Sequence, residues 1–226
     1  MVMRIIIIGA SKGIGKCLYD IFKEYRYDVI GTYCTDNNGN TDLLHLDSID
    51  IVEVNRFAEE YKANRVVLIN CAGISYNAFA HKSDLEKWRR VIDVNLIGTF
   101  NVIHSFLPYM RENKWGRIIN FSSVVTKMPT PGVSAYAASK SALIGLTKTL
   151  SIENAMFGIT VNSINLGYTN AGMGIKDVPE KYREIITDKI PEKRFCEPVE
   201  IFNTIEYIIK TEYLSGSIID LNGGLI

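Results

Sequence analysis

The stretch MRIIIIGASKGIG, residues 3–15, passes from an apolar run directly into a glycine-rich turn. The apolar run Met3–Ile8 predicts a buried strand, and Gly13–Tyr25 has the pattern of the helix that follows it. Glycines let the backbone approach a phosphate closely, and the amino end of the helix directs free N–H groups toward the anion. The stretch therefore predicts a nucleotide-binding strand–turn–helix unit, with a plain strand–helix connection as the alternative.

The rest of the chain continues this alternation, without a repeat, low-complexity tract or linker. The expected later strands are 28–32, 43–46, 65–70, 116–122, 160–165 and 217–221, and the expected helices are 50–61, 84–110 (interrupted or capped near Pro108), 134–157 and 198–209. Continuous apolar strands between helices predict an α/β fold, with a doubly wound parallel sheet of about seven strands and helices on both faces. We expect one domain over residues 1–226, with its site at the carboxyl ends of the strands.

Composition argues against several classes of function. Lys and Arg number 25, as do Asp and Glu, so no basic surface for nucleic acid or an anionic membrane is expected. The apolar runs are too short to span a bilayer, and the amino terminus lacks the pattern of a signal peptide. No metal site is expected, because the histidines and cysteines show no metal-ligand spacing. Free thiols in a reducing cytoplasm are the expected state of Cys17, Cys34, Cys71 and Cys196.

Tyr136 and Lys140 lie four residues apart in a stretch of good helix formers, SAYAASKS, which spans residues 134–141. On a helix this spacing places a phenol beside an ammonium. A nearby cation stabilises the phenolate, which favours proton exchange near neutral pH. Ser123 ends an apolar run upstream, where its hydroxyl could meet the tyrosine and hold a substrate carbonyl. The alternative is a surface tyrosine beside a surface lysine.

Several motifs, in their order and spacing, resemble the short-chain dehydrogenase/reductase family in its compact one-domain branch, which has a Rossmann-type fold. The resemblance runs almost from end to end and rests on Gly9–Gly15, Asn70–Gly73, Asp93–Asn95, Ser123, Tyr136 with Lys140, Gly158–Asn162 and Asp220–Gly224. The chain departs from common family residues at Ile8, Cys71, Leu166 and Ala171.

The resemblance implies a catalytic role for four residues. Tyr136 would protonate the carbonyl oxygen during reduction and act as the base in reverse. Lys140 would support that tyrosine and bind the nicotinamide ribose, and Ser123 would polarise the carbonyl. Asn95 would anchor a water relay to Lys140 through a local helix distortion, and an ordinary buried polar residue is its alternative. The redox chemistry itself would belong to the nicotinamide.

The expected cofactor contacts combine the glycine-rich turn with positions that the resemblance implies. They are Gly9, Ser11, Lys12, Gly13, Ile14, Gly15, Cys34, Asp47, Ser48, Asn70, Cys71, Ala72, Gly73, Tyr136, Lys140, Gly167 and Thr169. Asp47 matches the acid that binds the adenine amino group, with a helix cap as its alternative. Strand 28–32 is followed by no acid before Asp36, and Lys12 adds a cation in the turn. Both features favour NADP(H) over NAD(H), unless Lys12 is only a solvated charge and Asp36 folds back onto the ribose.

Within the family, the similarity is greatest to 3-oxoacyl-[acyl-carrier-protein] reductases. This implies NADPH-dependent reduction of a ketone to a secondary alcohol, with a 3-oxoacyl thioester as substrate and an acyl carrier protein as partner. Those enzymes receive the acidic carrier on basic residues, and the two corresponding positions here are Lys114 and Phe157. The alternatives are a free small ketone, sugar or secondary-metabolite intermediate as substrate, and a catalytically silent dinucleotide-binding scaffold or sensor.

The resemblance also implies a substrate lid and an assembly. The lid is expected near residues 168–195, which include Gly172, Gly174, Pro179, Pro191 and a charged helical patch. A cover over the sheet edge is the alternative. The helices near 91–106 and 134–157 are apolar or small nearly all round. This favours a homo-oligomer, a tetramer in the family, and burial within one chain is the alternative.

Overall fold

The computed structural model describes residues 3–173, 178 and 180–226. Its strands form one parallel seven-stranded sheet in the order β3-β2-β1-β4-β5-β6-β7. The strands are β1 (Arg4–Ile8), β2 (Asp28–Tyr33), β3 (Leu44–His45), β4 (Val66–Asn70), β5 (Gly116–Ser123), β6 (Ile159–Leu166) and β7 (Ile218–Leu221). The predicted doubly wound parallel sheet is confirmed. The strand order changes direction between β1 and β4, the kind of point where such sheets bind ligands.

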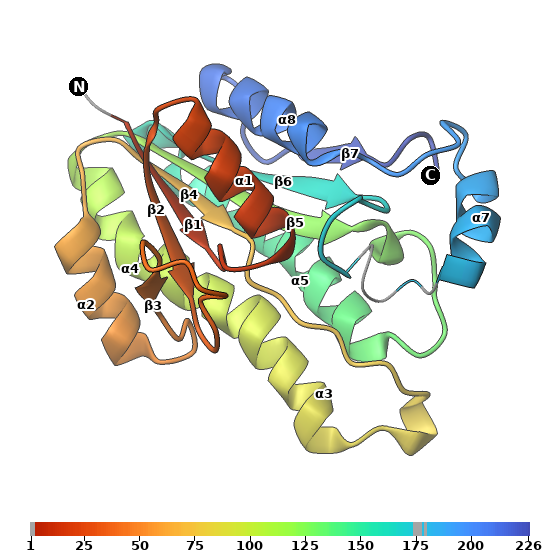
Figure 1. Ribbon diagram of the computed structural model, residues 1–226. Helices are drawn as coiled ribbons and strands as arrows, with labels where there is room; N and C mark the ends of the chain where they lie inside the picture. The colour runs from red at the N-terminus through yellow and green to blue at the C-terminus, as the bar shows by residue number, and fades with distance from the viewer. Residues whose placement is uncertain (1–2, 174–177, 179) are drawn as a thin grey trace.

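Helices cover both faces of the sheet (Figure 1). They are α1 (Gly13–Glu24), α2 (Ile51–Tyr61), α3 (Leu85–Ile92), α4 (Thr99–Glu112), α5 (Ser134–Asn154), α7 (Glu180–Lys189) and α8 (Pro198–Lys210). Helices α1 and α8 lie on one face, and α2, α4 and α5 lie on the other. Short helical turns complete the described chain: η1 (Ala80–Lys82), η2 (Asp93–Gly98), η3 (Val124–Thr126) and η4 (Ala155–Phe157).

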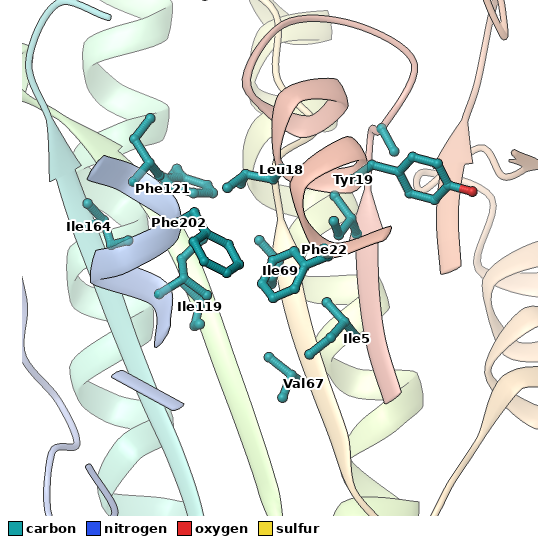
Figure 2. Close-up of a cluster of buried hydrophobic side chains, with 14 of the residues drawn as sticks. Ile5, Leu18, Tyr19, Phe22, Val67, Ile69, Ile119, Phe121, Ile164 and Phe202 are labelled. Carbon is teal, nitrogen blue, oxygen red and sulfur yellow. The ribbon is translucent and has the colours of Figure 1, made fainter. Parts of the chain in front are cut away.

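Strand β1 shows why the central strands are apolar without interruption. Successive side chains of a strand point to opposite faces of the sheet. Ile5 therefore packs with Phe22 of α1 in the cluster of Figure 2, whereas Ile6 packs with the helices on the other face. Both isoleucines are fully buried. Burying a side chain of this size contributes about 1.5–3 kcal/mol, so both faces of the strand stabilise the fold.

The helical segment expected over 84–110 differs in detail from its prediction. Asp84 caps the amino end of α3 by accepting hydrogen bonds from two backbone N–H groups. The π-helical turn η2 then joins α3 to α4, which continues through Pro108 to Glu112. The predicted break near Pro108 is therefore wrong. Phe106 and Met110 are buried on either side of the proline, and this packing holds the helix despite the backbone hydrogen bond that proline removes.

The prediction about apolar length also needs correction for this segment. We expected no stretch long enough to span a bilayer, yet Leu85–Glu112 is 28 residues of helix that meet that requirement by length and composition alone. Part of its apolar surface is already covered, because Val102, Ile103 and Phe106 are fully buried in the cluster that packs on the sheet. A core helix of a globular protein has the same composition.

Candidate active site

The glycine-rich turn between β1 and α1 has the shape of an anion cradle. Gly9 and Gly13 have φ angles of +84° and +59°, a region that favours glycine. A Cβ atom on Gly15 would lie 2.0 Å from the carbonyl oxygen of Gly9, and one on Gly9 would lie 2.8 Å from Cα of Ala72. Glycine is therefore required at these positions. The turn leads into the amino end of α1, which fits the pyrophosphate of a dinucleotide.

Lys12 is the cation of this turn. It occupies the N-cap position of α1 and is exposed. Its carbonyl oxygen accepts a 3.3 Å hydrogen bond from the backbone N–H of Lys16, and its ammonium has no hydrogen-bond or ion-pair partner in the described part of the chain. The neighbouring Ser11 is buried, and its carbonyl oxygen accepts a 2.8 Å hydrogen bond from Nδ2 of Asn38. The carboxylate of Asp36 accepts a hydrogen bond from the backbone N–H of Asn38, two residues later in the same loop.

The residues predicted for the adenosine side lie after β2 and β3 and do not line the cavity described below. Cys34 is exposed, and partial burial raises the pKa of its thiol. Asp47 accepts a 3.1 Å hydrogen bond from the backbone N–H of Ile49, in the turn before α2. The helix-cap alternative for Asp47 is wrong, because Asp50 is the residue that caps α2. Ser48 is buried, and its carbonyl oxygen accepts a 3.0 Å hydrogen bond from Nδ2 of Asn101.

Ser123, Tyr136 and Lys140 line one cavity of about 240 Å³ at the carboxyl ends of β5 and β6. The Nζ atom of Lys140 lies 5.6 Å from the centroid of the Tyr136 ring. The predicted pairing of phenol and ammonium on one face of α5 is therefore present. Five predicted cofactor residues also line this cavity: Ile14, Cys71, Gly73, Gly167 and Thr169.

Lys140 is almost fully buried, and its Nζ donates a 2.8 Å hydrogen bond to the carbonyl oxygen of Phe121. Burial lowers the pKa of Lys140 to about 8, since a buried ammonium loses the solvation of water. Burial also raises the pKa of the neighbouring Cys71 thiol, which therefore stays neutral. The cavity thus holds one titratable cation whose charge changes close to neutral pH.

Asn95 lies in η2, so the helix distortion expected at this residue is present. Its side chain is fully buried. Its Nδ2 donates to the carbonyl oxygen of Ile74 and to Oγ of Ser139, both at 3.0 Å, and its Oδ1 accepts a 2.8 Å hydrogen bond from the backbone N–H of Ile74. Ser139 in turn donates to the carbonyl oxygen of Tyr136. Asn95 therefore joins the loop after β4 to the helix that carries Tyr136.

Asn70 and Ala72 support the cavity from outside. Asn70 is buried and donates a 2.9 Å hydrogen bond from Nδ2 to Oδ1 of Asn120 on the neighbouring strand. The backbone of Ala72 packs against Gly9. A Cβ atom on Gly73 would lie 3.4 Å from Oδ1 of Asn95 and 3.8 Å from Nζ of Lys140. A Cβ atom at position 73 would therefore make ordinary van der Waals contacts with the two polar groups.

The loop after β6 folds back onto the glycine-rich turn. Thr169 is buried and donates a 3.0 Å hydrogen bond from Oγ1 to the carbonyl oxygen of Ala171. A Cβ atom on Gly172 would lie 3.1 Å from Cα of Gly13. The charged patch of the expected lid forms α7, whereas Gly174 and Pro179 lie outside the described residues.

Sequence reasoning missed the part of the cavity wall outside the expected lid, and it missed Ser139, whose hydroxyl accepts a hydrogen bond from the Asn95 amide. Ser139, three residues after Tyr136, could have been found from helical spacing. The wall comes from separate segments, and no local pattern marks it. Its members are Ser75, Asn77, Phe121, Ser122, Val124, Val125, Met128, Thr130, Val133, Leu166, Tyr168, Met173 and Val178.

Known proteins are similar to this chain in sequence and in architecture. A model of the short chain dehydrogenase family matches residues 3–181. The 3-oxoacyl-[acyl-carrier-protein] reductase FabG of Thermotoga maritima is 36% identical, over 98% of this chain and 96% of the relative. The acetoacetyl-CoA reductase of Shinella zoogloeoides is 32% identical, over 97% and 96%. A solved structure from Beutenbergia cavernae, described as a putative NAD(P) dependent gluconate 5-dehydrogenase with NADP bound at low occupancy, has a TM-score of 0.89 and 27% identity. The match covers 99% of this chain and 96% of that one.

Proposed function

The chain belongs to the short-chain dehydrogenase family and is an NAD(P)-dependent oxidoreductase, and from this premise we propose that it uses NADPH to reduce the keto group of a 3-oxoacyl thioester. The observation that carries the proposal is the convergence of Ser123, Tyr136 and Lys140 on one cavity beside the glycine-rich turn. The turn would hold the pyrophosphate, and Lys140 would bind the nicotinamide ribose. The nicotinamide supplies the hydride when it is bound.

The residues of this chain would manage the proton and the carbonyl. The Ser123 hydroxyl donates a hydrogen bond to the substrate oxygen, which fixes the carbonyl and stabilises the charge that develops on it. The Tyr136 hydroxyl gives its proton to the same oxygen, since an alkoxide is a far stronger base than a phenolate. The Lys140 ammonium stabilises the phenolate that remains. Asn95 holds the loop after β4 against α5, so these groups keep their relative positions.

The cavity wall supports an acyl substrate. Much of it is hydrophobic, with Val125, Met128, Val133 and Met173 among its members. Lys140 is the only charged side chain among the described lining residues, so the wall offers no further cation to a free carboxylate or phosphate. Two relatives at 32–36% identity are reductases of 3-oxoacyl or acetoacetyl thioesters.

Loss of NADPH absorbance with a panel of substrates tests the proposal. Turnover of acetoacetyl-CoA or another 3-oxoacyl thioester, above that of free ketones and sugars, is the expected result. A preference for a sugar would instead support the second candidate, which the gluconate dehydrogenase relative and the polar wall residues Ser75, Asn77 and Thr130 favour. Tight NADPH binding without turnover of any substrate would indicate a silent sensor.

A carrier protein as partner is supported by a side-chain contact that the sequence did not reveal. Phe157 takes one of the two positions where the resemblance implies a basic residue. The guanidinium carbon of Arg111 lies 3.9 Å from the centroid of the Phe157 ring, a cation–π contact. Arg111 and Lys114 are both exposed. Arg111 therefore places a positive charge next to the position that Phe157 occupies. Together, Arg111 and Lys114 offer two cations to an acidic carrier.

Arg111→Glu is expected to raise the KM for a carrier-bound 3-oxoacyl substrate by about tenfold, which corresponds to about 1.4 kcal/mol. The KM for the coenzyme A thioester should stay unchanged, because only the carrier contacts this surface. Steady-state kinetics on both substrates measure the effect. Arg56→Glu, at an exposed position on α2, is the matched control. Equal effects of Arg111→Glu on both thioesters would contradict the carrier site.

Lys12→Ala is expected to weaken NADPH binding by about tenfold to a hundredfold, the effect of losing a hydrogen bond to a charged group. The Lys12 ammonium has no partner in the described part of the chain, so it is available to the 2′-phosphate. The affinity for NADH should change little. Fluorescence titration with both cofactors measures the two dissociation constants. Equal weakening of both, or a wild-type preference for NADH, would show that Lys12 does not select the phosphate.

The remaining parts of the proposal concern organisation. One domain, with residues 168–195 as a lid over the cavity, is the arrangement that we propose. Assembly as a homotetramer through α4 and α5 is supported by exposed apolar side chains on these helices and on the helical turns next to them. They are Ile97 in η2, Phe100 on α4, Ile152 on α5 and Met156 in η4.

A further inference from the structure

A row of polar side chains crosses the last three strands, one residue before Ser123. The strand register pairs Ser122 of β5 with Asn165 of β6, and Asn165 with Asp220 of β7. Paired residues of parallel strands point to the same face of the sheet. Ser122 donates a 3.2 Å hydrogen bond from Oγ to the carbonyl oxygen of Lys140, so this row faces α5.

The carboxylate of Asp220 is held on both oxygens. Its Oδ1 accepts a 2.5 Å hydrogen bond from Nδ2 of Asn165, whose side chain is fully buried. Its Oδ2 accepts a 2.7 Å hydrogen bond from Nζ of Lys127. Lys127 directly follows η3, the turn that Ser123 caps. The ion pair therefore connects the turn after Ser123 to the last strand of the sheet.

The turn itself is closed by internal hydrogen bonds. The Oγ1 of Thr126 donates to the carbonyl oxygen of Ser123 at 2.9 Å. The backbone N–H groups of Lys127 and Met128 both donate to the carbonyl oxygen of Val124, at 2.9 and 2.8 Å. Such a turn moves as a unit, so its orientation depends on what holds its two ends. Strand β5 holds the first end, and the contact between Lys127 and Asp220 holds the second.

We propose that Lys127 and Asp220 are positioning residues that hold the Ser123 hydroxyl and the adjoining cavity wall in the geometry needed for carbonyl reduction. The proposal rests on the reductase function given above. The side chains of Lys127 and Asp220 are 47% and 37% exposed, and an ion pair of that exposure adds little to stability. Its effect on the position of Ser123 can still be large, because displacement of a reacting group by about 1 Å can cost about a hundredfold in rate.

Removing either charge tests the proposal on the full-length protein. Lys127→Met and Asp220→Asn are each expected to lower kcat for the 3-oxoacyl substrate by about tenfold to a hundredfold. The Kd for NADPH and the Tm should stay close to the wild-type values, because neither residue lines the cavity and the pair is exposed. Lys127→Arg keeps the charge and should retain the wild-type kcat.

Two further variants separate positioning from general surface effects. Lys62→Met is the matched control, since Lys62 is 45% exposed in an ion pair with Glu59 at the end of α2. It should leave kcat unchanged. The double variant Lys127→Met with Asp220→Asn should be no slower than either single variant, because both remove the same contact. Additive losses, or loss of Tm in proportion to kcat, would overturn the proposal.

Hydrogen exchange gives a readout that does not depend on the substrate. Asp220→Asn should speed amide exchange at the turn, in particular at Lys127 and Met128, relative to the wild type and Lys62→Met. An active wild type with unchanged kcat in both charge variants would overturn the positioning role alone. A wild type that reduces no 3-oxoacyl thioester would overturn the proposed substrate. Independently of turnover, unchanged amide exchange at the turn in Asp220→Asn would refute the connection between the turn and Asp220.

Discussion

Tyr136→Phe is expected to fold, bind NADPH with wild-type affinity, and lose about a hundredfold to ten-thousandfold in kcat, the range of general acid catalysis. Phenylalanine keeps the ring beside Lys140 and removes only the hydroxyl. The substrate oxygen then lacks the phenol that would protonate it. Ser123 can still donate a hydrogen bond to this oxygen but does not replace the lost acid. Steady-state reduction of a 3-oxoacyl thioester, with a cofactor titration in parallel, measures both quantities.

A second tyrosine provides the control for this variant. Tyr207→Phe removes an exposed phenol from α8, outside the cavity, and should leave kcat unchanged. If Tyr136→Phe also loses cofactor affinity, the substitution has disturbed the site. The cause of the lost turnover would then be tested with Tyr136→His, which restores a titratable group. A Tyr136→Phe enzyme within a few-fold of the wild type would refute the role of Tyr136 as proton donor.

Lys140→Ala is expected to lose turnover to a similar extent and also to bind NADPH more weakly, by about tenfold to a hundredfold. The two losses have separate causes. Without the ammonium the phenolate of Tyr136 is less stable, and the nicotinamide ribose loses a charged hydrogen-bond donor. Lys140→Met replaces the buried volume without the charge, so it should show the same two losses with less effect on Tm than Lys140→Ala.

The lowered pKa of Lys140 adds a pH dependence to this prediction. In the free protein Lys140 is protonated below about pH 8 and neutral above it. An anionic cofactor favours the protonated form, so NADPH binding should weaken as the pH rises through about 8. Stability should change in the opposite sense. An unfolded lysine keeps its proton up to a higher pH, so the folded state gains stability as the pH rises from the folded to the unfolded pKa.

Titrations of NADPH between pH 7 and 9.5 measure the effect on binding, and thermal melts over the same range measure the effect on stability. Lys140→Met should remove the part of each pH dependence that comes from this residue. A wild-type Kd for NADPH that does not change across this range would contradict the lowered pKa. A pH dependence that persists in Lys140→Met would assign it to another group.

The sequence determined the parallel sheet, because the signals for it are local. A strand buried on both faces must be apolar at every position, as β1 is, and a helix between two such strands can only cross over the sheet. The glycine-rich turn was equally readable, because a missing side chain is required where Gly15 meets the carbonyl oxygen of Gly9. The facing pair Tyr136 and Lys140 followed from helical spacing alone.

The sequence misjudged features in which packing outweighs local preference. Pro108 removes one helical hydrogen bond, a local signal for a break, yet the buried neighbours Phe106 and Met110 keep α4 continuous. The apolar length of Leu85–Glu112 reflects a helix with part of its surface against the sheet.

Only the tertiary structure decided the contacts between distant segments. Lys127 meets Asp220 across 93 positions of sequence, and Arg111 covers the ring of Phe157 from another helix. The wall of the cavity comes from strand ends and loops that share no common sequence pattern. Periodicity reports which face of an element is buried, but the partner of a side chain depends on how the sheet brings separate strand ends together. The residues to which we assign the chemistry could therefore be named from the sequence, whereas the parts that shape and hold the site required the fold.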